Sequence, residues 1–183
     1  MTEYRVPLPA RSGPAAADVN PDYLVTGLCA SLRDWRPDQF TRFLGWLDAG
    51  RDGEPPVPLR LDHRTHLFTS RGGEPANVGE CLKFRSVPAT ADGFPGGLLV
   101  LGVLYPDFAP GILGGMRQGE WLAMSVRGAE HAYPGRSDGD LWLGEVSLVS
   151  RVGDQLDADA LLLGHGPGAV TVWELLSGEA VAL

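Results

Sequence analysis

The sequence has few of the features that mark several common protein classes. Only two cysteines occur in 183 residues, Cys29 and Cys81, and they form neither a C-x-x-C motif nor a disulfide framework. We expect both to be reduced, buried thiols. Lys and Arg number 15 against 23 Asp and Glu, which gives a net charge of −8. This charge opposes a general nucleic-acid-binding role, because neutralising phosphates requires a surplus of basic residues.

Long apolar segments are also missing. No apolar run approaches the roughly 18 residues that a membrane-spanning helix needs. The first residues lack a basic segment followed by an apolar one, as a secretory signal would have. We therefore expect a soluble, intracellular protein that binds neither membrane nor nucleic acid. The hydrophobic fraction of 44% and the five tryptophans favour one domain with a packed core.

The composition divides the chain into three parts. Residues 1–21 are rich in proline and alanine without apolar periodicity, and we expect a flexible N-terminal arm. An arm that pairs with a partner subunit would have the same composition. Residues 22–165 are expected to form the folded domain. Residues 166–183 would be a C-terminal tail or the last element, in which Ala169–Leu176 could be a strand or a helix.

Within the folded domain, short apolar or alternating runs outnumber helical patterns, which favours an antiparallel sheet or barrel over βαβ repeats. One helix is predicted over Phe40–Leu47, because Pro37 and Asp38 suit its first turn and apolar residues follow at helical spacing. A second, short helix is expected within Phe108–Gln118. A strand-like run begins at Tyr23. The expected strands of one curved sheet are Val57–Leu61, Val78–Phe84, Leu98–Leu104, Trp121–Ser125 and Leu141–Val149.

Three polar residues lie at the ends or edges of these runs: His63, Ser125 and Glu145. Serine, histidine and a carboxylate are the components of an acyl-transfer site, in which a neutral histidine accepts the proton of the attacking serine. Taken singly, each has an ordinary structural explanation, such as a small residue at a strand end or a charged residue at a sheet edge. Backbone N–H groups at Arg127 and Gly128 could stabilise an oxyanion, or simply form a turn.

Two neighbours of His63 offer alternatives. His66 would point to the opposite face of an extended strand, and we interpret it as a solvated loop residue. A zinc site at the two histidines is disfavoured, since there is no H-E-x-x-H motif and no evident third ligand. Asp62 is a less favoured orienting carboxylate than Glu145, because it is adjacent to His63 in the chain.

The order of these motifs resembles that of the prohead (procapsid maturation) serine proteases of tailed phages and prophages. The resemblance covers about Leu24–Gly164, most of the chain. Its individual motifs are short, and their common order gives the resemblance its weight. They are V-T-G-L-C-A-S-L, P-V-P-L-R-L-D-H ending at His63, V-G-E-C-L-K-F, G-L-L-V-L-G-V-L, G-G-M-R-Q-G-E-W-L-A-M-S-V-R-G containing Ser125, and L-G-E-V-S-L-V containing Glu145.

The resemblance implies a fold similar to that of the herpesvirus assemblin protease: α+β, mainly β, with a small closed or partly open antiparallel β-barrel flanked by helices. It implies a serine endopeptidase with Ser125 as nucleophile, His63 as base and Glu145 as third triad member, and no cofactor or metal. The substrates would be the phage scaffold, the major capsid protein and the protease itself.

The expected location is the host cytoplasm, inside the assembling procapsid, and a homo-oligomer is left open. The alternative is a catalytically silent structural or assembly protein with the same fold.

Overall fold

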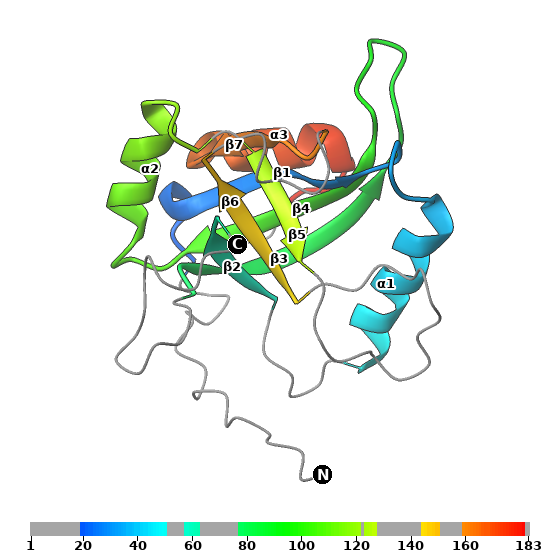
Figure 1. The fold of residues 1–183 in the computed structure, drawn as a ribbon, viewed down its shortest axis with the longest axis horizontal. Coiled ribbons are helices and arrows are strands. Elements are labelled where there is room, and N and C mark those ends of the chain that lie inside the picture. Colours follow the sequence, from blue (N-terminus) through cyan, green and yellow to red (C-terminus); the bar gives the residue numbers. More distant parts are fainter. Residues whose placement is uncertain are drawn as a thin grey trace, which may run out of the picture.

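Among the residues that the structure describes, seven strands form one sheet in the order β5-β6-β2-β3-β4-β1-β7 (Figure 1). The structure is a computed structural model that describes residues 19–50, 57–62, 77–121, 123–127, 144–150 and 159–181, without the side chains of residues 46–50 and 127. The strands are β1 (Leu24–Ser31), β2 (Pro58–Leu61), β3 (Gly79–Val87), β4 (Gly97–Leu104), β5 (Ala123–Arg127), β6 (Glu145–Val149) and β7 (Leu162–His165). The helices are α1 (Pro37–Gly50), α2 (Ala109–Arg117), α3 (Pro167–Ser177) and the short 3₁₀ helix η2 (Pro21–Tyr23).

The sheet is mixed and nearly closed. Strands β2 and β6 run parallel, whereas the other neighbouring pairs of this sheet are antiparallel. At the two edges of the sheet, the Met124 N–H on β5 donates to the Ala160 carbonyl at 3.2 Å, and Ala123 bridges to Leu161 just before β7. The expected mainly β, barrel-like fold with flanking helices is confirmed, with one parallel pair inside it. The expected strand residues 122 and 141–143 lie outside the described residues.

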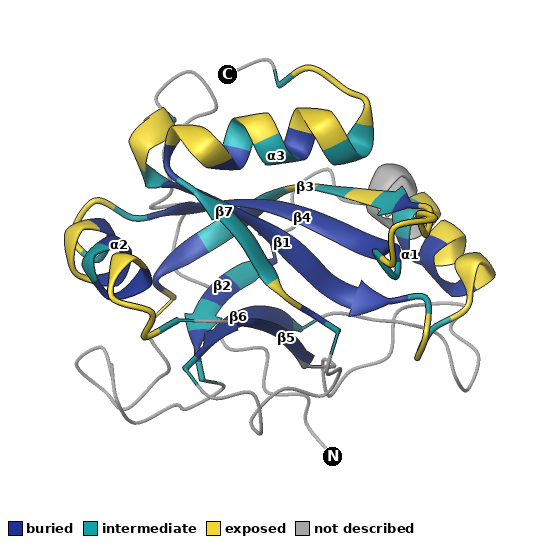
Figure 2. Cartoon of the chain, turned by 90° about the horizontal axis from the view of Figure 1, so that it is seen from above, coloured by how far each residue is buried: buried dark blue, intermediate teal, exposed yellow. Residues whose placement is uncertain are grey.

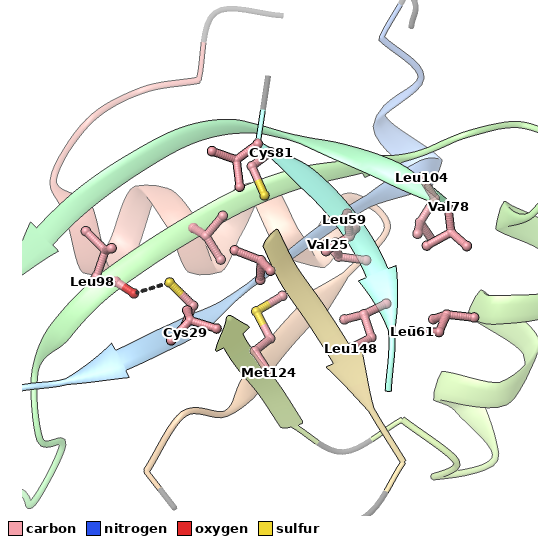
Figure 3. Packing of buried hydrophobic residues seen from close by; sticks show 14 of the residues in the cluster. Val25, Cys29, Leu59, Leu61, Val78, Cys81, Leu98, Leu104, Met124 and Leu148 are labelled. Atoms are coloured by element: carbon pink, nitrogen blue, oxygen red, sulfur yellow. Dashed lines mark hydrogen bonds between the residues drawn. The ribbon is translucent and has the colours of Figure 1, made fainter. Parts of the chain in front are cut away.

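The interior of the curved sheet is filled by apolar side chains from most of its strands. Figure 3 shows Val25 and Cys29 from β1, Leu59 from β2, Met124 from β5 and Leu148 from β6 meeting there. Both cysteines are buried and form no disulfide, as expected. The Cys29 thiol donates to the Leu98 carbonyl at 3.3 Å, which satisfies its weak donor inside the core.

A second apolar layer lies between the outer face of the sheet and α3. Helix α3 covers β1, β4 and part of β3, and only its outer side is exposed (Figure 2). Ala169 and Trp173, one helical turn apart, pack there against Leu99 and Leu101 of β4. Because β4 is buried on both faces, its sequence is almost uninterruptedly apolar rather than alternating. The segment Ala169–Leu176, for which strand and helix were both considered, is therefore helical.

The other two helices pack against the inner core. The predicted helix Phe40–Leu47 lies within α1, where Phe43 meets Phe84 of β3 edge to face with ring centroids 5.4 Å apart. The predicted short helix corresponds to α2, which buries Ile112, Leu113 and Met116. Across the described residues, every helix is too short or too polar to cross a membrane.

Candidate active site

The strands expected to bear the triad are neighbours in the sheet. Strand β6 lies between β5 and β2. Ser125 of β5 is directly opposite Ser147 of β6, and Arg60 of β2 is opposite Ser147 from the other side. Residues that are directly opposite on adjacent strands share a face of the sheet. The prediction that these three strands lie side by side is confirmed.

Alternation along the strands explains which face carries the polar residues. Met124 and Val126 of β5 and Val146 and Leu148 of β6 belong to the inner core. Successive side chains of a strand point to opposite faces, so the residues between them lie on the outer face of the sheet. We call the outward-facing set Arg60, Ser125, Glu145 and Ser147 the polar row.

Burial distinguishes the polar row from an ordinary solvated strand face. Ser125 is 1% exposed, Glu145 3% and Ser147 0%. Polar groups removed from water to this degree are destabilising unless they have hydrogen-bond partners. The contacts within the polar row therefore determine both its stability and the chemistry that it can perform.

The Glu145 carboxylate has a described partner at each oxygen. Arg60 Nη1 donates to Glu145 Oε2 at 2.6 Å, and Ser147 Oγ donates to Glu145 Oε1 at 3.0 Å. Arg60 is fixed a second time, because its Nε donates to Asn77 Oδ1 at 3.0 Å. The result is a largely buried ion pair that orients the carboxylate toward β2.

Glu145 and Ser125 occupy diagonal positions on β6 and β5, since Glu145 is opposite Arg127 and Ser125 is opposite Ser147. Diagonal neighbours have Cα atoms roughly 7–8 Å apart, within reach of long side chains. The two residues therefore share one face of the sheet at a spacing compatible with a triad, in which an imidazole stands between serine and carboxylate.

Asp62 anchors the end of β2 to the end of β6. Its backbone φ of 50° is in the left-handed region, and its N–H donates to the Leu148 carbonyl at 2.8 Å. Its carboxylate accepts the Ser150 N–H at 2.7 Å and the Ser150 hydroxyl at 2.9 Å. Those contacts hold the Asp62 carboxylate against Ser150 at the end of β6. His63, the next residue in the sequence, lies outside the described residues, as do His66, Gly128 and the Arg127 side chain.

Two members of the polar row were not predicted as functional from the sequence. Arg60 occupies a polar position of an alternating strand, which usually faces solvent. Ser147 follows Glu145 by two residues, a spacing that places both on one face of a strand. That spacing was the available signal for Ser147. The contact of Arg60 with Glu145 depends on the long-range pairing of β2 with β6, for which the sequence contains no local signal.

A further polar pair is formed by Glu80 of β3 and Tyr105, the residue that follows β4. Burial, together with the negative charge of Glu80 and a hydrogen bond to it, raises the pKa of Tyr105 to about 12. Tyr105 therefore remains a neutral hydrogen-bond donor throughout the physiological pH range. Across the part of the chain that the structure describes, no three His, Cys, Asp or Glu side chains are grouped as metal ligands would be.

Comparison with known proteins gives no independent assignment: no protein-family model matches the sequence, and no curated protein matches it.

Proposed function

We propose that the protein is a serine endopeptidase of the phage or prophage procapsid-maturation type, with Ser125, His63 and Glu145 as its catalytic triad. One observation carries the proposal. Ser125 and Glu145, from different strands, share one face of the sheet, and the strand leading to His63 lies beside the Glu145 strand. Two sequence segments about 85 residues apart are joined here by the contact of Arg60 with Glu145.

In the proposed reaction, Ser125 Oγ attacks the carbonyl carbon of a peptide bond while His63 accepts the hydroxyl proton. The tetrahedral intermediate collapses, the C–N bond breaks and His63 gives the proton to the leaving amine. A water molecule, deprotonated by His63, then attacks the acyl ester. The ester C–O bond breaks, and His63 returns the proton to Ser125 Oγ. Glu145 orients the imidazole and stabilises the imidazolium.

The substrate class rests on the resemblance of the ordered motifs. That resemblance favours scaffold and capsid-protein segments as substrates, together with self-cleavage, within the assembling procapsid in the host cytoplasm. The fold is compatible with it, since a nearly closed, mainly β sheet with flanking helices is what the resemblance implied.

A second function is favoured by a different observation. Ser125 is 1% exposed, and both oxygens of Glu145 have partners in Arg60 and Ser147. A buried serine and an ion-paired glutamate also suit a structural or assembly protein in which the polar row only fixes strand register. In that case Ser125 would react with a serine-directed probe no faster than any other serine of the chain.

Reaction with a fluorophosphonate probe separates the two functions. The activated Ser125 Oγ should displace fluoride from phosphorus and add one probe mass, located by peptide mass spectrometry. Ser125→Ala should lose the adduct, whereas Ser86→Ala, a change at a half-buried serine on β3, should keep it. Absence of an adduct on the parent protein, or its persistence in Ser125→Ala, would rule out the serine-hydrolase proposal.

Co-expression with the scaffold and capsid precursors of the same prophage tests the substrate class. We expect fragments of the precursors with the parent protein and intact precursors with Ser125→Ala. Labelling of Ser125 without cleavage of either precursor would leave a serine hydrolase but refute the procapsid substrates.

A further inference from the structure

We propose that Arg60 is a positioning residue that holds the Glu145 carboxylate in its working orientation. This inference rests on the proposed serine-protease function, because the orientation matters only if Glu145 orients a catalytic base. Arg60 does not belong to the expected triad, and its role follows from its contacts with Glu145 of β6 and with Asn77, two residues before β3.

The Arg60 guanidinium is fixed at two points. Nη1 contacts Glu145 Oε2 at 2.6 Å, and Nε contacts Asn77 Oδ1 at 3.0 Å. A guanidinium is planar, so two bonds from different nitrogens fix its rotation as well as its position. The carboxylate is then held between this group and Ser147 Oγ, which contacts its other oxygen.

Charge gives Arg60 a role that Ser147 cannot fill. Glu145 is 3% exposed, and a buried carboxylate without a cation beside it is strongly destabilised. Without Arg60, the carboxylate would rotate toward water or other donors. A displacement of about 1 Å in a catalytic group can cost about 100-fold in rate. We therefore expect loss of Arg60 to slow the reaction of Ser125 by roughly 10- to 100-fold.

A merely structural ion pair would act differently. Its loss would lower the melting temperature of the protein, and labelling would slow only to the extent that the protein unfolds. A positioning residue acts through Glu145, so its loss should have no further effect once Glu145 has been replaced. Groups that act as one unit show this lack of additivity.

The experiment measures the rate of Ser125 labelling by a fluorophosphonate, together with the melting temperature, in five variants. They are Arg60→Met, Arg60→Lys, Glu145→Gln, the double variant Arg60→Met/Glu145→Gln, and the control Arg85→Met. Arg85 is an exposed arginine on β3 that pairs with Glu179 at 2.9 Å, so its replacement removes an ion pair remote from the polar row.

We expect Arg60→Met to slow labelling by roughly 10- to 100-fold and Arg60→Lys, which keeps the charge, to recover part of that loss. Arg85→Met should label as fast as the parent. In the Glu145→Gln background, Arg60→Met should cause no further slowing. Parental labelling by Arg60→Met would overturn the proposal, and so would an equal loss with and without Glu145.

Two results separate failure of this inference from failure of the proposed function. If the parent protein is not labelled at Ser125, the proposed function fails and the role of Arg60 fails with it. If the parent is labelled and Arg60→Met is labelled equally fast, only the role of Arg60 fails. Should Arg60→Met not fold, Arg60→Lys and Asn77→Ala carry the test. Arg60→Lys keeps the charge but lacks the two-point guanidinium, and Asn77→Ala removes one of the two anchors of that guanidinium, so both should slow labelling in a Glu145-dependent manner.

Discussion

Replacement of Gly27 by alanine tests the closure of the sheet. Gly27 lies on β1, where β7 and the edge strand β5 both approach it. A Cβ at this position would overlap the Leu161 carbonyl oxygen and lie 2.6 Å from Met124 Sδ and 3.2 Å from Leu162 Cα. The first obstacle is backbone, which cannot rotate away as a flexible side chain would.

The cost can be worked from those contacts. Overpacking a tight interior site costs about 1–3 kcal/mol. The Leu161 carbonyl also accepts the Leu28 N–H at 2.9 Å, and moving it weakens a hydrogen bond worth about 0.5–1.5 kcal/mol. Together these give a loss of about 1.5–4.5 kcal/mol in the free energy of unfolding. For a domain of this size, that corresponds to a decrease of roughly 3–18 °C in melting temperature.

Calorimetry or urea denaturation of Gly27→Ala measures the loss, with Gly111→Ala as the matched control. Gly111 lies in α2, where an added Cβ would meet open space, so alanine there should stabilise the helix by about 0.5–1 kcal/mol. The reasoning is refuted if Gly27→Ala is as stable as the parent, because β5, β1 and β7 would then not approach one another as described.

Three other predictions follow from the site and the two cores. Ser125→Ala should abolish probe labelling with little change in melting temperature, and a labelled Ser125→Ala protein would contradict this. His63→Ala should lose a comparable amount of labelling rate, because nucleophile and base act as a unit. Glu145→Gln should lower the labelling rate by about 10⁴-fold or less. The pKa of Tyr105 is raised from 10.0 to about 12, so its contribution to stability is fully present below pH 10 and is lost as the pH rises toward 12. Between pH 10 and pH 12, the melting temperature of Tyr105→Phe should therefore fall less steeply with pH than that of the parent protein. Equal slopes would contradict the raised pKa of Tyr105. Trp173 Nε1 is buried without a hydrogen-bond partner among the described residues. In urea denaturation, Trp173→Phe should therefore lower the free energy of unfolding by much less than Trp173→Ala, for which about 3–5 kcal/mol is expected. Equal losses would indicate that the indole N–H has a partner.

Local pattern was sufficient to predict most of the strands. The alternation of Val57–Leu61 and the apolar run Leu98–Leu104 correspond to β2 and β4 because each pattern reports how many faces of the strand are buried. Helix α1 was predictable from Pro37 and the helical spacing of Phe40 and Phe43, which are both buried. These features depend on near neighbours in the chain.

Helix α3 shows where opposing local signals left the prediction open. Val170, Thr171 and Val172 are β-branched and favour a strand. Pro167 at the first turn and Gly178 just past the end, with φ of 71°, are the start and stop signals of a helix. Packing decides between them, because only a helix places Ala169 and Trp173 together on the outer face of the sheet.

The candidate site was predictable in part. Ser125 and Glu145 followed from their positions in apolar runs, and the structure places them on one face. The contact of Arg60 with Glu145 was not predictable, because the parallel pairing of β2 with β6 depends on how the whole sheet closes. A strand arginine carries the same local signal whether it faces water or a buried carboxylate.

The pairing of β2 with β6 also has a consequence for the order of folding. Strands β3 and β4 form a hairpin from adjacent segments, whereas Arg60 and Glu145 are separated by 85 residues. Closing such long loops costs chain entropy before any contact forms, so non-local pairings form slowly and late. The β3–β4 hairpin can therefore form early, while the pairing that brings Arg60 and the strand leading to His63 beside Glu145 is completed among the last parts of the sheet. A chain in which β2 and β6 have not yet paired would have the Ser125 and Glu145 strands without Arg60 and without the strand that leads to His63. The proposed site would therefore be complete only in the finished fold.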